Sequence, residues 1–266
     1  MDSGSSTTSR YAPDQERSLH LSLLIGQEWS AWSAHHVEHG TVEALCWGKN
    51  DEALRDGLLP QAPFSVSFVS LPEWSTLVPD AALVPGSEAQ YLKLVHGGIP
   101  TGVMRDEPIS SLSATCIYVH DDLTERTVLQ RFPHARALPL HGVLLHAAEA
   151  RHGATPLILA HRSAERLDVH VMREGRLVLS NSYPARSVND VLYFTLLAAD
   201  VTGLDPQTAE VQLCGTHTGK AELDLVRRYF PFCIPASGQG WSELKPAVGT
   251  APERWLAALE QFACVS

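Results

Sequence analysis

Apolar runs and alternating apolar–polar segments occur in the same order in both halves of the chain. The first half opens with three such segments separated by turns, and these predict a three-stranded meander over residues 19–25, 29–35 and 41–47. The elements expected after the meander are strands at 64–71 and 114–119 and helices at 87–96, 122–132 and 138–151. We expect Asp122 and Glu125 to open the helix at 122–132 with a capping box.

The second half repeats this order of elements. An apolar strand, an alternating strand and a third strand after the Glu174–Gly175 turn predict another meander. The expected elements are strands at 156–161, 166–172, 176–181 and 209–215 and helices at 187–203, 220–230 and 255–264. Capping boxes are expected at Ser187–Asp190 and at Thr250–Glu253.

This order of elements predicts the fold. Three strands, a helix, a strand and a helix make up a ribonuclease-H-like domain, and a tandem pair of such domains is the architecture of actin, sugar kinases and heat-shock ATPases. We therefore predict an α/β protein of actin-like ATPase fold, with tandem ribonuclease-H-like domains that each contain a mixed five-stranded sheet and flanking helices. We expect a disordered tail at residues 1–17, domain I at 18–150 and domain II at 151–266. Because the halves share no residue-level repeat, a single irregular α/β domain is the alternative.

Composition and charge narrow the possible partners. The 266 residues are 44% hydrophobic, which is enough for an ordinary globular core. The net charge of −10 is spread along the chain without a Lys/Arg run, so we expect no nucleic-acid partner. No apolar run reaches the ~18 residues of a membrane span, so we expect no membrane insertion and a cytoplasmic location. The five cysteines include no CxxC pair, which disfavours a disulfide framework and a zinc knuckle.

Residues 211–226 predict a strand, a glycine turn and a helix, and the central GTHTGKA is superficially similar to a phosphate loop. A phosphate loop needs four residues between its glycines and a Ser or Thr after its lysine. Gly215 and Gly219 enclose only three residues, and Ala221 follows the lysine, so the segment does not fit. In actin-like proteins the turn at this position passes close to the adenosine, which makes Gly215 and Thr216 candidate cleft residues. The alternative is that Gly215 only permits a positive φ in a tight turn.

An actin-like ATPase also needs two phosphate-binding hairpins, each of which usually begins with an Asp that holds Mg²⁺ and its water. The first hairpin, L24-I-G-Q-E28, has no such Asp, and Gly26 and Gln27 are candidate cleft residues only. The second hairpin, A160-H-R-S-A-E165, has neither Asp nor glycine at the turn. Residues 19–25 also lack the acidic residues of a ribonuclease-H-like nuclease. The sequence therefore disfavours both ATP hydrolysis and nuclease chemistry.

Other patterns give no catalytic or metal-binding residue. The histidine motif H35-H36-x-x-H39 is the strongest metal candidate among thirteen histidines. Neighbouring strand residues point to opposite faces, which prevents chelation unless the strand has ended, so we expect a solvated hairpin end. No GxSxG motif is present, and for Asn181, Asp190 and Tyr193 strand-end hydrogen bonding and helix capping are the simpler roles. We expect no catalytic residues, no bound metal and no cofactor.

Several short stretches together resemble a bacterial family known as domain of unknown function 3822 (DUF3822). The matching stretches are Leu77-Val78-Pro79, Tyr91-Leu92, Phe132-Pro133, His141, Asn181, Asp190 to Tyr193, and Phe262 to Cys264. The resemblance runs from about residue 18 to the end of the chain. It implies the actin-like ATPase fold and brings no established activity.

The fold pattern without metal-binding carboxylates favours a non-enzymatic protein, an actin-like pseudoenzyme. We expect it to bind another protein or a small ligand through its interdomain cleft or a sheet edge. A scaffold comparable to the pilus-assembly members of the superfamily is a structural version of this hypothesis. The alternative is a divergent ATP-dependent actin-like or sugar-kinase-like enzyme with unusual phosphate turns.

Overall fold

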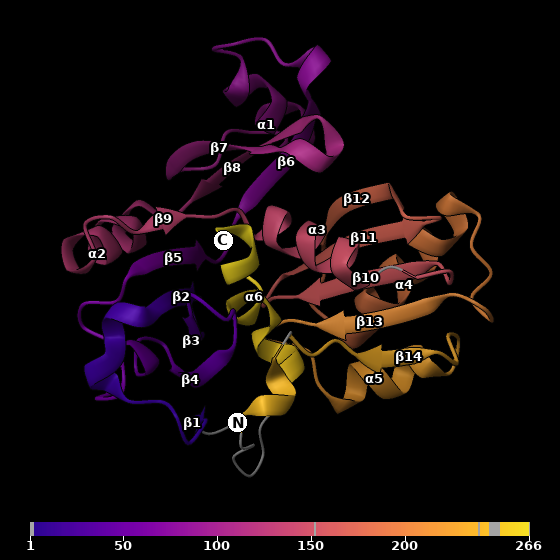
Figure 1. Cartoon of the computed structure of the whole chain (residues 1–266). Coiled ribbons are helices and arrows are strands. Elements are labelled where there is room, and N and C mark those ends of the chain that lie inside the picture. The colour runs from indigo at the N-terminus through magenta and orange to yellow at the C-terminus, as the bar shows by residue number, and fades with distance from the viewer. Residues whose placement is uncertain (1–2, 152, 239, 245–250, 266) are drawn as a thin grey trace. The chain divides into compact units, whose positions relative to one another are not determined.

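The computed structural model describes residues 3–151, 153–238, 240–244 and 251–265. The chain folds into two compact units (Figure 1). The first unit contains the described residues within 1–143, 240–250 and 261–266, and the second contains those within 144–239 and 251–260. The predicted division into domains at residue 150 stays a prediction.

The first unit contains a mixed six-stranded sheet in the order β1-β4-β3-β2-β5-β9. Its strands are β1 (Gly4–Thr7), β2 (Leu19–Ile25), β3 (Trp29–His36), β4 (Val42–Lys49), β5 (Ser65–Ser70) and β9 (Arg136–Ala137). The predicted meander is confirmed as β2, β3 and β4, and β5 joins β2 in parallel. Leu21, Leu23, Trp32 and Phe68 form one core with Val128 of helix α2 (Asp122–Arg131). Helix α2 therefore covers this face of the sheet.

A second, three-stranded sheet in the first unit has the order β6-β8-β7. Its strands are β6 (Trp74–Pro79), β7 (Val103–Ile109) and β8 (Ala114–His120), all antiparallel to their neighbours. Helix α1 (Glu88–His96) packs Leu92 against Ile117 and Val119 of β8. The apolar pattern predicted only β8 and α1, because the edge strands β6 and β7 lack a continuous apolar run.

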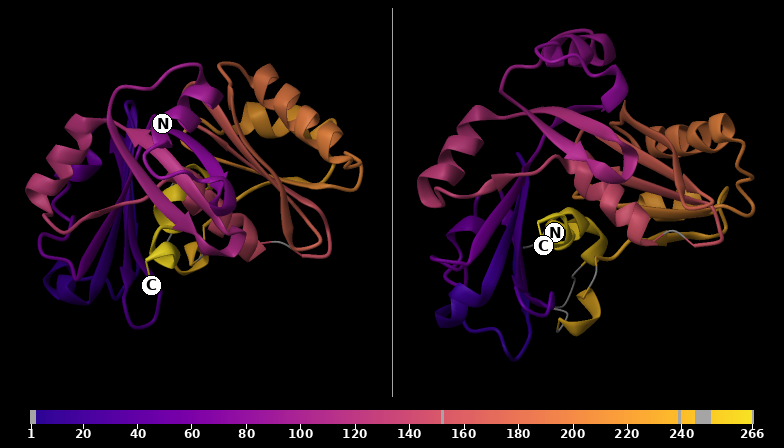
Figure 2. Two further views of the ribbon diagram at one scale, coloured as in Figure 1. Left: turned by 90° about the horizontal axis from the view of Figure 1, so that it is seen from above. Right: turned by 45° about the horizontal axis from the view of Figure 1, so that its top comes forward.

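The second unit contains a five-stranded sheet in the order β12-β11-β10-β13-β14, with the first three strands antiparallel and the last three parallel. The strands are β10 (Leu157–Arg162), β11 (Arg166–Arg173), β12 (Arg176–Pro184), β13 (Glu210–Cys214) and β14 (Cys233–Pro235). Helices α4 (Val188–Thr202) and α5 (Lys220–Arg227) pack on one face of this sheet (Figure 2). Val169, Val211, Val191 and Val226 belong to the core between them.

Two of the three helix starts predicted as capping boxes lie within the described residues, and their outcomes differ. At α4 the box is confirmed, since Ser187 Oγ accepts from Asp190 N and Asp190 Oδ2 accepts from Ser187 N. At α2 the prediction is wrong, because Asp121 is the N-cap and its Oδ2 accepts from Thr124 N at 2.7 Å. Glu125 does not reach back to the helix start, since Arg105 and His120 donate hydrogen bonds to its carboxylate.

Two other segments differ from the expectation. Residues 4–7 of the tail that we expected to be disordered form the edge strand β1, which pairs with β4 through backbone groups that need no apolar side chains. Residues 1–2 of that tail and Thr250 of the last capping box lie outside the described residues. The helix predicted at 255–264 consists of short pieces, with the single α-helical turn α6 (Leu256–Leu259) between two 3₁₀ turns. Helix α3 (Leu140–Arg151) agrees with the prediction.

Candidate functional site

The β2–β3 turn holds the candidate residues Gly26 and Gln27. Gly26 N donates to Trp29 O at 3.0 Å and closes the turn. A Cβ atom at Gly26 would lie 2.7 Å from the same carbonyl oxygen, so the tight turn itself requires glycine. Gln27 is exposed, and the strand ends before the turn with the apolar Leu24 and Ile25. A binding role for Gly26 and Gln27 stays a prediction.

Gly215 and Thr216 follow β13 in the second unit. Gly215 has φ 104°, and a Cβ atom there would lie 2.3 Å from Arg162 O and 2.6 Å from Arg162 N. Gly215 N donates to Glu253 O at 2.9 Å, and Thr216 is buried with its hydroxyl 3.0 Å from His217 Nδ1. The positive-φ interpretation of Gly215 is therefore confirmed, and the adenosine contact stays a prediction.

The residues after Gly215 bond to neighbouring protein atoms. Thr218 Oγ1 donates to Cys214 O, and Lys220 Nζ pairs with Asp224 one turn along α5. Gly219 N donates to Glu222 Oε2 at 3.1 Å. Lys220 and the hydroxyl of Thr218 therefore have structural roles at the start of α5.

A buried polar group lies on the sheet of the second unit, where His161 of β10 is opposite Asp168 of β11. The two side chains are 3.9 Å apart between Nδ1 and Oδ2, and Ser182 Oγ donates to Asp168. Burial lowers the pKa of His161, against the opposing effect of the Asp168 carboxylate. The set has the residue types of a Ser-His-Asp triad, but the serine bonds to the aspartate instead of the histidine, and His161 is fully buried. This geometry does not generate a nucleophile.

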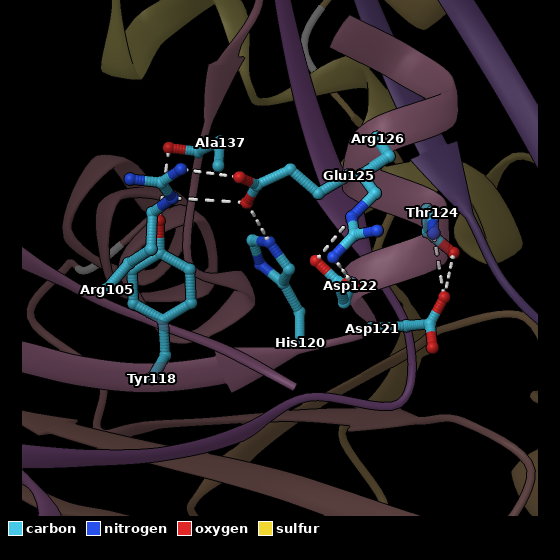
Figure 3. A network of polar contacts seen from close by, with 9 residues as sticks. All are labelled: Arg105, Tyr118, His120, Asp121, Asp122, Thr124, Glu125, Arg126 and Ala137. Atoms are coloured by element: carbon cyan, nitrogen blue, oxygen red, sulfur yellow. Dashed lines mark hydrogen bonds and ion pairs between the residues drawn. The ribbon is translucent and has the colours of Figure 1, made fainter. Parts of the chain in front are cut away.

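A charged network lies in the first unit beside β7, β8 and α2 (Figure 3). Glu125 accepts two hydrogen bonds from Arg105, at 2.5 Å from Nη2 and 3.1 Å from Nε, and one from His120 Nε2 at 2.6 Å. Burial raises the pKa of Glu125, but the bonds from Arg105 and His120 outweigh it and hold the pKa below its usual value. The same contact with Glu125 raises the pKa of Arg105. Glu125 is therefore an ionised, buried anchor for a half-exposed guanidinium.

Tyr118 completes this side of the site. Its hydroxyl donates to Ala137 O of β9 at 3.2 Å, which links the three-stranded sheet to the edge of the six-stranded one (Figure 3). Burial raises the pKa of Tyr118, and the carboxylates of Glu73 and Glu107 add to this shift. The phenol therefore stays neutral and acts as a hydrogen-bond donor.

These side chains border a pocket of about 310 Å³. Its lining residues are Phe68, Arg105, Asp106, Glu107, Tyr118, Glu125, Leu129, Ala135, Arg136 and Ala137. Arg136 of β9 pairs with Glu107 of β7, and the side chains of Arg105 and Arg136 are 45% and 50% exposed. We name this site the Arg105–Arg136 pocket. It presents two guanidinium groups to solvent, each held by one carboxylate.

The Arg105–Arg136 pocket was not predicted from the sequence. Its residues come from β7, β8, α2 and β9, and the apolar pattern did not predict β7 or β9. One local signal was available: His120 ends a buried strand and Glu125 lies on the first turn of the next helix, which brings a buried imidazole and a carboxylate together.

The six-stranded and five-stranded sheets with their helices define an actin-like ATPase fold. A protein of Bacteroides thetaiotaomicron VPI-5482 with actin-like ATPase fold and unknown function matches with a TM-score of 0.75 and 14% identity, over 94% of this chain and 98% of that one. A chain of the PilM–PilN type IV pilus biogenesis complex matches with a TM-score of 0.51 and 13% identity, over 93% and 98%. The chain belongs to the DUF3822 family of proteins of unknown function, whose model matches residues 68–233. The predicted fold class and family are thus confirmed. The predicted strand number is right for the second unit, but the main sheet of the first unit has six strands and not five, because the tail strand β1 adds to its edge.

No curated protein sequence shows significant similarity to this chain. Within the described part of the chain, no helix has both the length and the apolar character that a membrane span requires.

Proposed function

We propose that this chain is a non-enzymatic binding protein that uses the actin-like ATPase fold without phosphate chemistry. One observation carries the proposal: β2 ends with Leu24 and Ile25, and β10 has Ala160 and His161 at the corresponding place. An ATPase of this fold needs carboxylates there, because Mg²⁺ requires oxygen ligands and fixed waters beside the γ-phosphate. Apolar side chains and a buried imidazole do not supply them.

The charged residues beside the β10–β11 turn support this interpretation, since they pair with one another. Arg162 pairs with Glu222, and both side chains are buried. Burial lowers the pKa of Arg162, and its guanidinium is already engaged by the carboxylate of Glu222. At the turn itself, Glu165 lies 3.6 Å from Arg186 in an exposed pair.

The Arg105–Arg136 pocket is the site that we propose for the partner. Each guanidinium carries five N–H donors, and the contacts with Glu125 and Glu107 use only part of them. The remaining donors on Arg105 and Arg136 favour a planar carboxylate, which arginine binds in a bidentate manner.

The strands around the pocket favour an extended protein segment as the ligand. β7 and β9 are edge strands, each hydrogen-bonded along one side only among the described residues. Unpaired backbone groups of an edge strand can receive an additional strand from a partner. We therefore propose a partner segment with acidic side chains that lies along this edge. The PilM–PilN match supports the idea only to the extent that the same fold occurs in a protein complex.

Peptide binding tests this proposal. Fluorescein-labelled peptides with alternating Val and Glu, or Val and Lys, would be titrated and followed by fluorescence polarisation. We expect binding of the Glu peptide only, despite the net charge of −10, which repels acidic peptides in general. Arg136→Ala should weaken binding by about tenfold to 100-fold, as expected for a charge-assisted bond of about 1.5–3 kcal/mol.

Arg126→Ala is the matched control, because Arg126 is also exposed and paired with one carboxylate, Asp122, outside the pocket. Equal binding of both peptides, or equal loss in Arg136→Ala and Arg126→Ala, would overturn the site. Phosphate release from ATP with Mg²⁺ would instead favour the divergent ATP-dependent enzyme.

A further inference from the structure

The β3–β4 turn brings together two histidines of the H35-H36-x-x-H39 motif. β3 ends at His36, and Gly40 N donates to His36 O at 2.8 Å to close the turn. His35 is buried, with its ring stacked 5.2 Å from Phe262. His36 faces the other way and stacks on His39 at 4.7 Å with 13° between the ring planes. As expected, His35 and His36 point to opposite faces of the strand. Because the strand ends at His36, the turn places His39 beside His36.

Glu38 adds a carboxylate to this pair of imidazoles. One possible ligand atom from each of His36, Glu38 and His39 lies within 4.8 Å of the others. Glu38 N donates to His36 Nδ1 at 3.3 Å, which shows that the lone pair of Nδ1 is directed into the turn. A cation bound at Nδ1 would replace this long hydrogen bond.

Contrary to the expectation from the sequence that the protein binds no metal, we propose that His36, Glu38 and His39 form a binding site for a divalent first-row transition-metal ion, with Zn²⁺ as the best-suited ion. Two imidazoles and one carboxylate match the N and O ligands of Zn²⁺, whereas Ca²⁺ and Mg²⁺ take oxygen ligands. Ligand atoms about 2.0–2.2 Å from a tetrahedral ion lie roughly 3.3–3.6 Å apart. Glu38 and His39 are exposed, so rotation of their side chains achieves this contraction without changing the core.

The site has room for further ligands of the ion. His36 and His39 line a cavity of about 630 Å³ together with Arg10, Thr41 and Glu43. Glu43 lies 3.2 Å from Arg10 and accepts a hydrogen bond from Thr41 at 2.9 Å. The negative charge of Glu43 in the cavity wall is therefore balanced by Arg10. Three protein ligands leave one position of a tetrahedral ion open, and this position is available to water or to an anionic ligand.

The experiment uses untagged full-length protein from which metals have been removed by a chelator, titrated with ZnCl₂ by isothermal titration calorimetry. We expect one ion per chain, and about tenfold or greater loss of affinity in both His36→Ala and His39→Ala. Glu38→Gln should also weaken binding. His134→Ala is the matched control, because His134 is exposed and lies outside this turn, and it should bind like wild type.

A second measurement separates binding from folding. The melting temperature of each variant without metal should equal that of wild type, because His36 and His39 lie at a partly exposed turn. Co²⁺ bound to wild type should give the visible absorption of a low-coordinate N/O site, and His39→Ala should lose it. Absence of saturable Zn²⁺ binding, or binding that His36→Ala and His39→Ala leave unchanged, would overturn the proposal.

Discussion

Ser67 donates a hydrogen bond to Gln261 Oε1 at 2.8 Å, joining residues 194 positions apart. Gln261 Nε2 donates to Leu23 O at 2.9 Å, and Ser67 Oγ lies 3.0 Å from His20 Nε2. Because the single hydroxyl proton of Ser67 goes to Gln261, its oxygen must accept from His20 Nε2–H. His20 Nδ1 then accepts from Ser65 Oγ at 2.8 Å. This chain of bonds anchors the C-terminal segment of the first unit to β2 and β5.

Replacement of Gln261 tests this anchor. Gln261→Ala leaves the Leu23 carbonyl and the Ser67 hydroxyl buried without this partner, so we expect a loss of about 2–4 kcal/mol in the free energy of unfolding. Urea unfolding measures the difference. Gln207→Ala is the control, because Gln207 Nε2 also donates to a backbone carbonyl, that of Tyr229 at 3.2 Å, but at the exposed surface. Similar losses of stability in both variants would show that the buried hydrogen bonds of Gln261 contribute no more than one exposed hydrogen bond.

His20 predicts a pH dependence of stability. Burial lowers the pKa of His20 from 6.5 to about 4. The unfolded chain therefore binds a proton first as the pH falls, and stability is lost between about pH 6.5 and pH 4. The loss from this one group is about 3 kcal/mol, since each unit of pKa shift corresponds to ~1.4 kcal/mol.

Unfolding free energies at several pH values, for wild type and His20→Gln, measure this contribution. Gln cannot titrate, so the stability difference between wild type and variant should shrink or reverse towards pH 4. A difference that stays constant from pH 7 to pH 4 would contradict the neutral, buried His20.

A single methyl group at Gly215 should lower the stability of the protein severely. Gly215→Ala would force an alanine to φ 104° and place Cβ 2.3 Å from Arg162 O, so the backbone must move. We expect a loss of about 2–3 kcal/mol or more, measured by urea unfolding. Gly98→Ala is the matched control, because a Cβ atom at Gly98 meets nothing within 4 Å. If both variants were equally stable, the tight β13 turn would be refuted.

Much of the fold was predictable because buried strands carry a strong signal. β2, β10 and β13 are short apolar runs bounded by turn residues. Together with the alternating strands and the helices, their repeated order predicted the fold. The edge strand β7 was missed because three consecutive charged residues, Arg105 to Glu107, interrupt its apolar pattern and Pro108 follows them. An edge strand tolerates proline, because the missing N–H costs no sheet hydrogen bond when it faces solvent. In the sequence alone, a proline within a segment argues against a strand.

The sites were less predictable than the fold. Arg105 and Arg136 lie 31 positions apart and meet one pocket only because β7 and β9 are neighbouring edges. The proposed metal site depends on where β3 ends, because the turn after His36 places the ring of His39 on that of His36. Sequence periodicity places strand ends within a few residues at best, and side-chain convergence at a turn needs greater accuracy than that.

The binding of ATP with Mg²⁺ tests the central claim, that the fold is used without phosphate chemistry, most directly. The measurement is the melting temperature in millimolar ATP and MgCl₂, with MgCl₂ alone as the blank and an ATP-binding protein of actin-like fold as the positive control. A ligand at 100 times its dissociation constant adds ~2.7 kcal/mol, which raises the melting temperature of a chain of this size by several degrees. We predict no rise, because Leu24, Ile25, Ala160 and His161 stand where carboxylates would organise Mg²⁺. A rise of several degrees that requires both ATP and Mg²⁺ would contradict the account.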